Sequence, residues 1–429
     1  MQWFQSLLYL ALVSSTAIAA PTPALQQKSK IQKRSFKVDV IQRRDYVPNG
    51  LAAIRKAQRK FGMIPTHIDL GALDIQFEPG VEREALSKAA TSLENGEVQN
   101  MPTQNDVQYL SPVTIGGQEF VMNFDTGSAD TWVFNTQLDE ATNQGHGVFD
   151  PKKSTTFKDI EGGTFSIRYG DGSFASGTLG TDTVDIGGAT VENQAFGLPN
   201  NVSSSFAADE ASDGLVGLAF SRLSTMRPER QTTFFEKVAP FLEQPVLAAQ
   251  LKSGAPGSYE FGTVDDAKFS GDMINVTVDT SRGFWEIPSS FFMIGNGADL
   301  QTIQTGVQTA IIDTGTTLML LNPEVVEAYY AQVEGAEPSV RAGGYVYPCD
   351  SERPDLYVSV GDDHLARIPG EDITFARVGR EVNTKREYCF GGIQSNEGSS
   401  LQIFGDVFLK AIFTVFDLRG PSLGLAAHA

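Results

Sequence analysis

The chain has 429 residues, of which 41% are hydrophobic, and its 33 Lys and Arg against 52 Asp and Glu give a formal net charge of −19. This length exceeds what one ordinary hydrophobic core organises, so we expect at least two lobes. The acidic balance argues against a nucleic acid as partner, because proteins that bind phosphate backbones present basic surfaces.

The first 20 residues are apolar, contain no charged side chain and end in Ala17-Ile18-Ala19. This pattern is typical of a secretory signal peptide, although the usual basic residue near its start is absent. A buried helix or a membrane anchor are the alternatives, but the apolar run is too short for a good membrane span. We therefore predict a signal peptide at 1–20 and an exported protein that is not membrane-bound, with an extracellular or a vacuolar destination left open.

Residues 21–88 contain 13 Lys and Arg but seven Asp and Glu, so this segment is basic while the rest of the chain is acidic. Opposite charges predict that the segment docks on the acidic body, and a solvated basic arm is the alternative. Residues 54–63 (IRKAQRKFGM) have apolar side chains at helical spacing, which predicts a helix that could dock.

From about residue 107, short apolar segments alternate with Gly, Asn and Asp, which predicts a mainly β protein. Residues 107–124 predict two strands joined at Gly116-Gly117, and 164–186 predict a long hairpin turning at 170–172. The helices we expect are short, at 232–242 and at 322–333, the second with Asn322 as its N-cap.

Cysteine and glycosylation patterns agree with export. Cys349 and Cys389 are the only cysteines, so we expect one disulfide between them. Two sequons begin at Asn201 and Asn275, and either could be used or unused.

No cofactor or metal is predicted. The four histidines, at 67, 146, 364 and 428, show no metal-ligand spacing, and His146 within Gly-His-Gly is expected to be a loop residue. The glycine-rich segment at 169–173 lacks the Lys of a phosphate-binding loop.

An internal repeat is the most informative feature. Asp125 ends one apolar run as Asp-Thr-Gly-Ser, and Asp313 ends another as Asp-Thr-Gly-Thr. The apolar-apolar-Gly pattern ending at Gly217 recurs at Gly405, with the same offset of 188 residues that separates the two aspartates. A duplicated lobe that contributes one carboxylate per copy explains both repeats.

Two such carboxylates, shielded from water and close together, cannot easily both ionise and would share one proton. The aspartic-protease dyad is the standard example of this effect. The pair could activate a water against a carbonyl, one aspartate accepting a proton while the other donates one. Gly127 and Gly315 would allow sharp turns with backbone N–H groups near the carboxylates. Hydroxyl groups for the outer carboxylate oxygens and for contacts between the lobes are expected from Ser128, Thr316, Thr126 and Thr314.

Five segments in order, FDTGSADTW, YGDGSFASG, DGLVGLAF, AIIDTGTTL and FGDVFLKAIFTVFD, resemble the pepsin family of aspartic endopeptidases, most closely its secreted fungal, penicillopepsin-like branch. The resemblance runs from about Tyr109 to the C-terminus. It implies a mainly β, bilobal fold with two pseudo-symmetric lobes, here 89–272 and 273–429, a central cleft and a β-hairpin flap. Protein or peptide substrates, and a monomer, are expected.

The resemblance also implies roles for further residues. Tyr169 and Gly170 would lie on the flap, and Trp132 would support Tyr169 through its indole N–H. Asp171 is either a carboxylate that accepts a basic residue of the substrate or an ordinary turn residue, and Asp406 either adds negative potential near Asp313 or makes an internal hydrogen bond. Residues 21–88 would be an inhibitory propeptide with Lys60, or secondly Lys56, paired to the aspartates, and processing is expected near Lys88-Ala89.

Two other functional classes share parts of this sequence pattern. Actin-like ATPases and sugar kinases also use paired Asp-x-Gly turns, but they need a helix-rich α/β pattern, which this chain lacks. A non-catalytic relative would be expected to lose an aspartate, a turn residue or the flap tyrosine, and all are present here.

Overall fold

The computed structural model describes residues 34–39, 41–42, 50–61, 63, 75–77, 109–169, 173–253 and 255–429. All of them belong to one of the two units into which the chain divides, residues 33–429. The predicted signal peptide (1–20), the flap residues Gly170 and Asp171, and the processing site near residue 88 lie outside the described residues.

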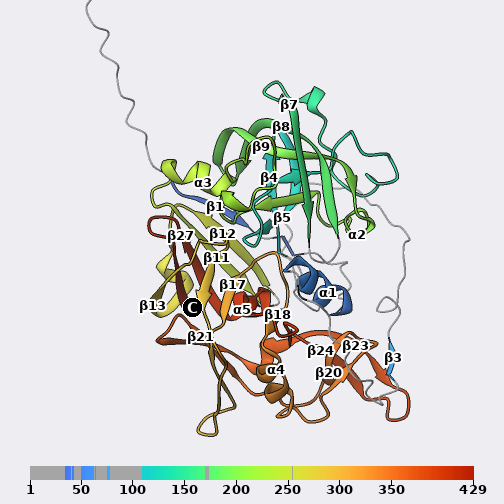
Figure 1. Cartoon of the computed structure of the whole chain (residues 1–429), viewed down its shortest axis with the longest axis vertical. Helices are drawn as coiled ribbons and strands as arrows, with labels where there is room; N and C mark the ends of the chain where they lie inside the picture. The colour runs from blue at the N-terminus through green and yellow to red at the C-terminus, as the bar shows by residue number, and fades with distance from the viewer. Residues whose placement is uncertain are drawn as a thin grey trace, which may run out of the picture. The chain divides into compact units, whose positions relative to one another are not determined.

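The first lobe is built on one eight-stranded sheet with the order β2-β4-β5-β10-β6-β9-β8-β7 (Figure 1). Strands β4 and β5 pair around Gly116 and Gly117, whose positive φ angles of 55° and 77° suit glycine. The strands span Ile41–Gln42 (β2), Tyr109–Ile115 (β4), Gln118–Asp125 (β5), Trp132–Val133 (β6), Lys158–Arg168 (β7), Phe174–Ile186 (β8), Ala189–Val202 (β9) and Gly214–Gly217 (β10).

The second lobe contains three smaller sheets. The first, in the order β14-β17-β26-β18-β25, consists of Glu286–Pro288, Thr309–Ile312, Leu401–Phe404, Met319–Leu321 and Ile393–Ser395. The second, β16-β15-β21-β22, consists of Gln301–Gln304, Phe291–Ile294, Leu356–Val360 and His364–Ile368. The third, β19-β20-β24-β23-β3, consists of Glu337–Ser339, Gly344–Pro348, Glu387–Gly391, Thr374–Glu381 and Ile75–Phe77.

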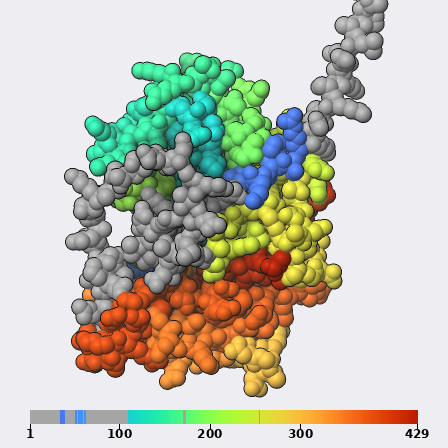
Figure 2. Space-filling model, turned by 180° about the vertical axis from the view of Figure 1, so that it is seen from behind, coloured from blue at the N-terminus to red at the C-terminus, as the bar shows by residue number. Residues whose placement is uncertain are grey.

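A six-stranded sheet joins sequence from both halves of the chain, in the order β1-β12-β11-β27-β28-β13. In the space-filling view, the blue residues that include β1 lie against the yellow surface to which β12 belongs (Figure 2). The strand β13 crosses residues 272 and 273, where we expected the lobes to meet. The six strands span Phe36–Asp39 (β1), Val246–Lys252 (β11), Ala255–Phe261 (β12), Phe269–Thr277 (β13), Ile412–Asp417 (β27) and Ser422–His428 (β28).

The helices are short, as expected. They are α1 (Gly50–Lys60), α2 (Ser204–Ala207), α3 (Phe234–Val238), α4 (Pro323–Tyr330) and α5 (Asp406–Ala411), with 3₁₀ turns at Pro151–Lys153, Ser221–Leu223, Ala239–Phe241, Asp266–Lys268 and Gly370–Ile373. Asn322 caps α4 by accepting a hydrogen bond from the backbone N–H of Glu324. The helix expected at 232–242 is α3 followed by a 3₁₀ turn, because Pro240 cannot donate the hydrogen bond that would continue an α-helix.

The helix predicted at 54–63 is α1, and it begins four residues earlier, at Gly50. The backbone at Gly50 lies so close to the Phe390 ring that an added Cβ would collide with it, and Leu51 packs against Gly343. These tertiary contacts stabilise the additional helical turn at residues 50–53. Ile54, Ala57 and Met63 are buried in a hydrophobic cluster that the second lobe supplies, so α1 docks through its apolar face.

Cys349 and Cys389 form the predicted disulfide, with a Cα–Cα distance of 5.0 Å and a sequence separation of 40. A crosslink that closes a loop of this length contributes about 3–4 kcal/mol to the free energy of unfolding.

No helix among the described residues is long and apolar enough to cross a membrane. The structure therefore confirms the predicted mainly β, two-lobed fold.

Candidate active site

Asp125 and Asp313 occupy equivalent places in the two lobes. Asp125 ends β5, which pairs in parallel with β10 so that Gly217 lies opposite Asp125. Asp313 follows β17, which pairs in parallel with β26 up to Ile312 opposite Phe404. Both carboxylates are buried, with exposed fractions of 1% and 0%. The repeat seen in the sequence is therefore a repeat of one strand-turn unit.

Each turn hydrogen-bonds its own carboxylate in the same way. The N–H of Gly127 donates to Asp125 Oδ1 at 2.9 Å, and Ser128 Oγ donates to Oδ2 at 2.6 Å. In the second lobe, the N–H of Gly315 donates to Asp313 Oδ1 at 3.0 Å, and the hydroxyl of Thr316 donates to Oδ2 at 2.5 Å. These bonds fix the orientation of both carboxylates and favour their ionised forms.

Two threonines join the turns across the lobes. Thr126 Oγ1 donates to the carbonyl of Ile312 at 2.9 Å, and Thr314 Oγ1 donates to the carbonyl of Phe124 at 2.7 Å. Each hydroxyl also accepts from the other turn, the N–H of Thr126 at 3.1 Å and the N–H of Thr314 at 3.0 Å. This reciprocal set of four bonds is fully buried, so the position of one aspartate relative to the other is fixed.

The carboxylates face each other closely. A Cβ added at Gly127 would lie 2.6 Å from Asp313 Oδ1, and one added at Gly315 would collide with Asp125 Oδ1. Any residue larger than glycine would thus push the opposite carboxylate away. Glycine is required at both positions for the carboxylates to approach.

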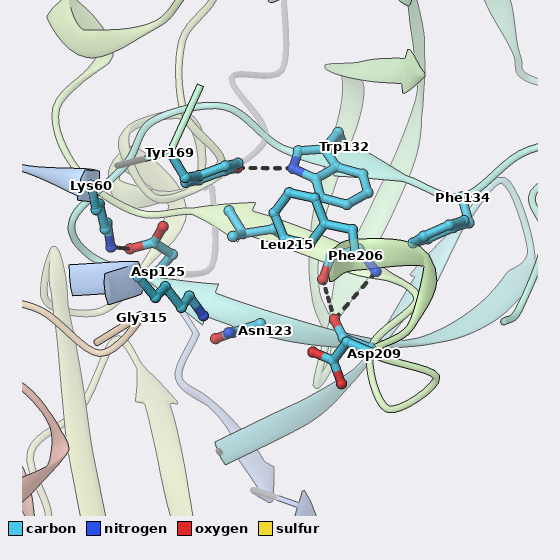
Figure 3. Close-up of a pocket in the computed structure, with 13 residues that line it drawn as sticks. Lys60, Asn123, Asp125, Trp132, Phe134, Tyr169, Phe206, Asp209, Leu215 and Gly315 are labelled. Carbon is cyan, nitrogen blue, oxygen red and sulfur yellow. Dashed lines mark hydrogen bonds and ion pairs between the residues drawn. The ribbon is translucent and has the colours of Figure 1, made fainter. Parts of the chain in front are cut away.

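Lys60, near the end of α1, lies between the aspartates. Its ammonium is 2.7 Å from Asp125 Oδ1 (Figure 3) and 2.8 Å from Asp313 Oδ2. The Lys60 side chain is 5% exposed, so these are buried ion pairs. Lys56 lines the same pocket but forms no ion pair with either aspartate.

The pKa values of these three groups are coupled through their contacts. Burial alone would raise the pKa of Asp125, but the charge of Lys60 and hydrogen bonds with Asp313, Lys60 and Ser128 lower it to about 2. Burial raises the pKa of Asp313; Lys60 opposes this shift, and the Asp125 carboxylate adds to it. Burial disfavours the Lys60 ammonium, yet the two aspartates outweigh it and raise the pKa of Lys60. Asp313 is thus the first of the two carboxylates to take up a proton as the pH falls.

Trp132 and Tyr169 are joined in the first lobe. The indole N–H of Trp132 donates to the hydroxyl of Tyr169 at 2.9 Å, and both side chains are buried (Figure 3). They line the pocket that contains Asp125. Gly170 and Asp171 follow Tyr169 but lie outside the described residues.

Further residues of this pocket were missed in the sequence. Phe206 packs against both Trp132 and Tyr169, with ring centroids 4.9 Å and 5.3 Å apart. No sequence signal pointed to this segment except that it precedes the repeated motif at Leu215. The wall that these residues form also includes Asn123, Phe134, Asp209, Ser212 and Leu215.

Asp406 is the first residue of α5 and is 2% exposed. Its backbone N–H donates to the carbonyl of Thr316 at 2.8 Å, beside the Asp313 turn.

The two sequon residues, Asn201 on β9 and Asn275 on β13, are exposed. Their glycosylation stays a prediction.

A family profile described as eukaryotic aspartyl protease matches residues 108–428. The chain belongs to this family. It is 55% identical to aspartic protease PEP3 of Coccidioides posadasii over 98% of this chain and 94% of that protein. It is 53% identical to a putative aspergillopepsin A-like aspartic endopeptidase of Aspergillus fumigatus over the whole of both chains. Penicillopepsin-1 of Penicillium rubens is 44% identical over 82% of this chain and 88% of that protein.

These similarities confirm the predicted penicillopepsin-like fungal branch. This aspartyl protease is therefore an aspartic endopeptidase, a hydrolase that acts on peptide bonds. The rival ATPase and sugar-kinase classes are set aside.

Loss of the Trp132–Tyr169 hydrogen bond is expected to reduce the catalytic efficiency of this aspartyl protease, and the substitution Tyr169→Phe tests this. The variant keeps the aromatic ring and removes the hydroxyl that Trp132 contacts. Because one buried hydrogen bond contributes about 1 kcal/mol, we expect kcat/KM for a peptide substrate to fall about fivefold. Tyr357→Phe, at a half-buried tyrosine on β21, is the matched control. Equal kcat/KM values for both variants would contradict a positioning role for this bond.

Proposed function

We propose that this aspartyl protease cleaves peptide bonds at acid pH with Asp125 and Asp313 as its catalytic pair. The observation that carries the proposal is the meeting of two buried carboxylates at equivalent turns, both within hydrogen-bond distance of one ammonium. That ammonium occupies the place of the groups that the pair would otherwise contact, a water and the substrate carbonyl.

In the proposed reaction the pair shares one proton. The ionised carboxylate accepts a proton from a water as the water oxygen attacks the carbonyl carbon, and the protonated carboxyl donates to the carbonyl oxygen. The tetrahedral intermediate then loses its C–N bond as a proton passes to the leaving nitrogen, which yields a carboxylic acid and an amine. Because one proton is needed, activity falls as the pH rises through the raised pKa of Asp313, where the second carboxyl ionises.

The pocket supports a preference for bulky apolar residues beside the scissile bond. Phe134, Phe206 and Leu215 line it together with Trp132 and Tyr169, and apolar side chains gain by leaving water there. A substrate Lys before the scissile bond would be accepted through an ion pair with the Asp171 carboxylate. Cleavage of two peptides that differ only in Lys or norleucine before the scissile bond tests this directly.

The proposal extends to a zymogen. Residues 21–88 would be the propeptide, with Lys60 inhibiting the pair, and the mature enzyme would comprise the lobes 89–272 and 273–429. The burial of α1 against the second lobe and the two Lys60 ion pairs support this assignment. A signal peptide at 1–20 would direct the monomeric precursor to an extracellular or vacuolar location.

One experiment tests the proposed function. Purified precursor is incubated at acid pH, its shortening is followed by mass spectrometry, and peptide cleavage is measured with and without a statine-type transition-state mimic. We expect self-shortening followed by cleavage that the mimic blocks, because its hydroxyl replaces the attacking water. Acid-stable precursor with no cleavage would contradict the proposal.

A further inference from the structure

His146 lies in the turn between β6 and β7, outside the catalytic pair. Its ring stacks on Phe134, with centroids 3.7 Å apart and planes at 7°. Nδ1 is 2.9 Å from the carbonyl oxygen of Ser212, and Nε2 is 3.3 Å from the carbonyl oxygen of Ala207. Both ring nitrogens therefore face hydrogen-bond acceptors that have no proton to give.

The protonation state follows from counting donors. A neutral imidazole has one N–H, so in either tautomer one nitrogen lone pair would face a carbonyl oxygen. Only the imidazolium, with an N–H on each nitrogen, can donate to both carbonyls at once. The described geometry is thus complete only when His146 is protonated.

The two carbonyls belong to the segment 203–213, which contains α2 and forms one wall of the pocket beside Asp125. Phe206 directly precedes the first anchored residue, Ala207, and its ring contacts Trp132 and Tyr169. Asp209 lies between the two anchors and also lines the pocket (Figure 3). His146 is therefore connected to the pocket through the backbone that positions these side chains.

The charged residues near His146 are carboxylates. The N–H of Gly147 donates to Asp213 Oδ1 at 2.6 Å, which places a carboxylate next to this turn. Strand β6 and Phe134 contribute no titratable group, and β5, which contacts Gly147 through Phe120, contributes Glu119 and, at its C-terminal end, Asp125. The turn 135–147 and the segment 203–213 contain no Lys or Arg; their charged residues are Asp139, Glu140, Asp209, Glu210 and Asp213.

We propose that His146 is a positioning residue whose imidazolium form fixes the backbone of residues 207–212, so that the Phe206 wall of the substrate pocket is ordered in acid and loosens when the ring loses its proton. This inference rests on the proposed acid protease function, and it adds a second source of acid dependence that is separate from the aspartate pair. It predicts that substrate binding, rather than the chemical step, responds to His146.

The structural test uses the full precursor with Asp125→Asn, which cannot digest itself. We expect ¹⁵N NMR to show both His146 nitrogens protonated at about pH 4.5, and amide exchange in 203–213, corrected for intrinsic rates, to rise about tenfold by about pH 7.5. His146→Gln in the same background should exchange at the faster rate at both pH values. His364→Gln, at an exposed histidine on β22, should behave as the parent does. Exchange that is independent of pH in the parent, or a neutral ring in acid, would overturn the proposal.

The kinetic test uses the active enzyme. In acid, His146→Gln should raise KM about fivefold and leave kcat within about twofold, since the aspartates are untouched. His146→Phe preserves the ring stack on Phe134 and removes both donors, so it should match the Gln variant. A wild-type KM for the Phe variant would show that stacking alone matters and would refute the proposal. Absence of peptidase activity in the wild-type enzyme would instead contradict the proposed function and leave the NMR and exchange tests of His146 decisive.

Discussion

Replacing Asp313 with Asn is expected to reduce kcat/KM for peptide cleavage in acid by about a thousandfold or more. The amide preserves the size of the side chain and can accept from Gly315 and Thr316, but it can neither share a proton with Asp125 nor donate and recover one during the reaction. Loss of one acid–base group typically costs a factor of about 10²–10⁴. Initial rates with a fluorogenic peptide measure the effect, and circular dichroism checks the fold.

Asp130→Asn is the matched control, because Asp130 is another fully buried aspartate and lies five residues after Asp125 in the first lobe. It accepts from the backbone N–H of Thr225 at 3.1 Å and from the Thr225 hydroxyl, and burial raises its pKa. An asparagine resembles the protonated acid, so activity in acid should stay within about threefold of wild type. Comparable losses in the two variants would mean that burial of a carboxylate, not the dyad, is what matters. A variant at Asp313 that retained full turnover would contradict the assignment outright.

Replacing Lys60 with Met in the precursor is expected to remove latency. The change leaves the two carboxylates without their buried cation, and breaking such a pair costs on the order of 3–5 kcal/mol. The pair can then take up its shared proton at a higher pH. We expect self-processing, followed by mass spectrometry against pH, to begin about one pH unit or more above the wild-type value.

The direction of this pH effect follows from the shifts themselves. Lys60 has a raised pKa, so it stays charged throughout the acid range. Asp313 has a raised pKa and loses its charge first as the pH falls, while Asp125 stays ionised to about pH 2. Attraction between α1 and the pair therefore weakens stepwise on acidification. Lys56→Met is the control, and an equal shift in that variant would assign the effect to the general charge of α1.

The parts of the site that the sequence predicted are those encoded locally. An apolar strand followed by Asp-Thr-Gly predicts a turn that orients the aspartate carboxylate. Because the motif occurs twice, the sequence also predicted that Asp125 and Asp313 lie close together. Asn322 before Pro323 likewise identified the start of α4. These features depend on neighbouring residues, so a short pattern contains them.

The features that escaped prediction depend on pairing across long distances in the chain. Phe206 reaches the pocket only because β9 and α2 bring it against Trp132, and no periodicity marks it. The contacts of His146 are with carbonyl oxygens, which every residue has, so its sequence context indicated only a loop. The edge strands β1 and β3 were missed because each is short and is defined by its partner, β12 and β23 respectively.

The sheet that contains β11, β12, β13, β27 and β28 has a consequence for synthesis of the protein. Strand β28 pairs on one side with β27 and on the other with β13, and β27 pairs with β11, which lies more than 150 residues earlier in the chain. The ribosome must therefore translate residues up to His428 before all strands of this sheet can pair. A nascent chain that lacks β28 would leave the facing edges of β27 and β13 unpaired, so proteolytic competence would be postponed until His428 has been translated.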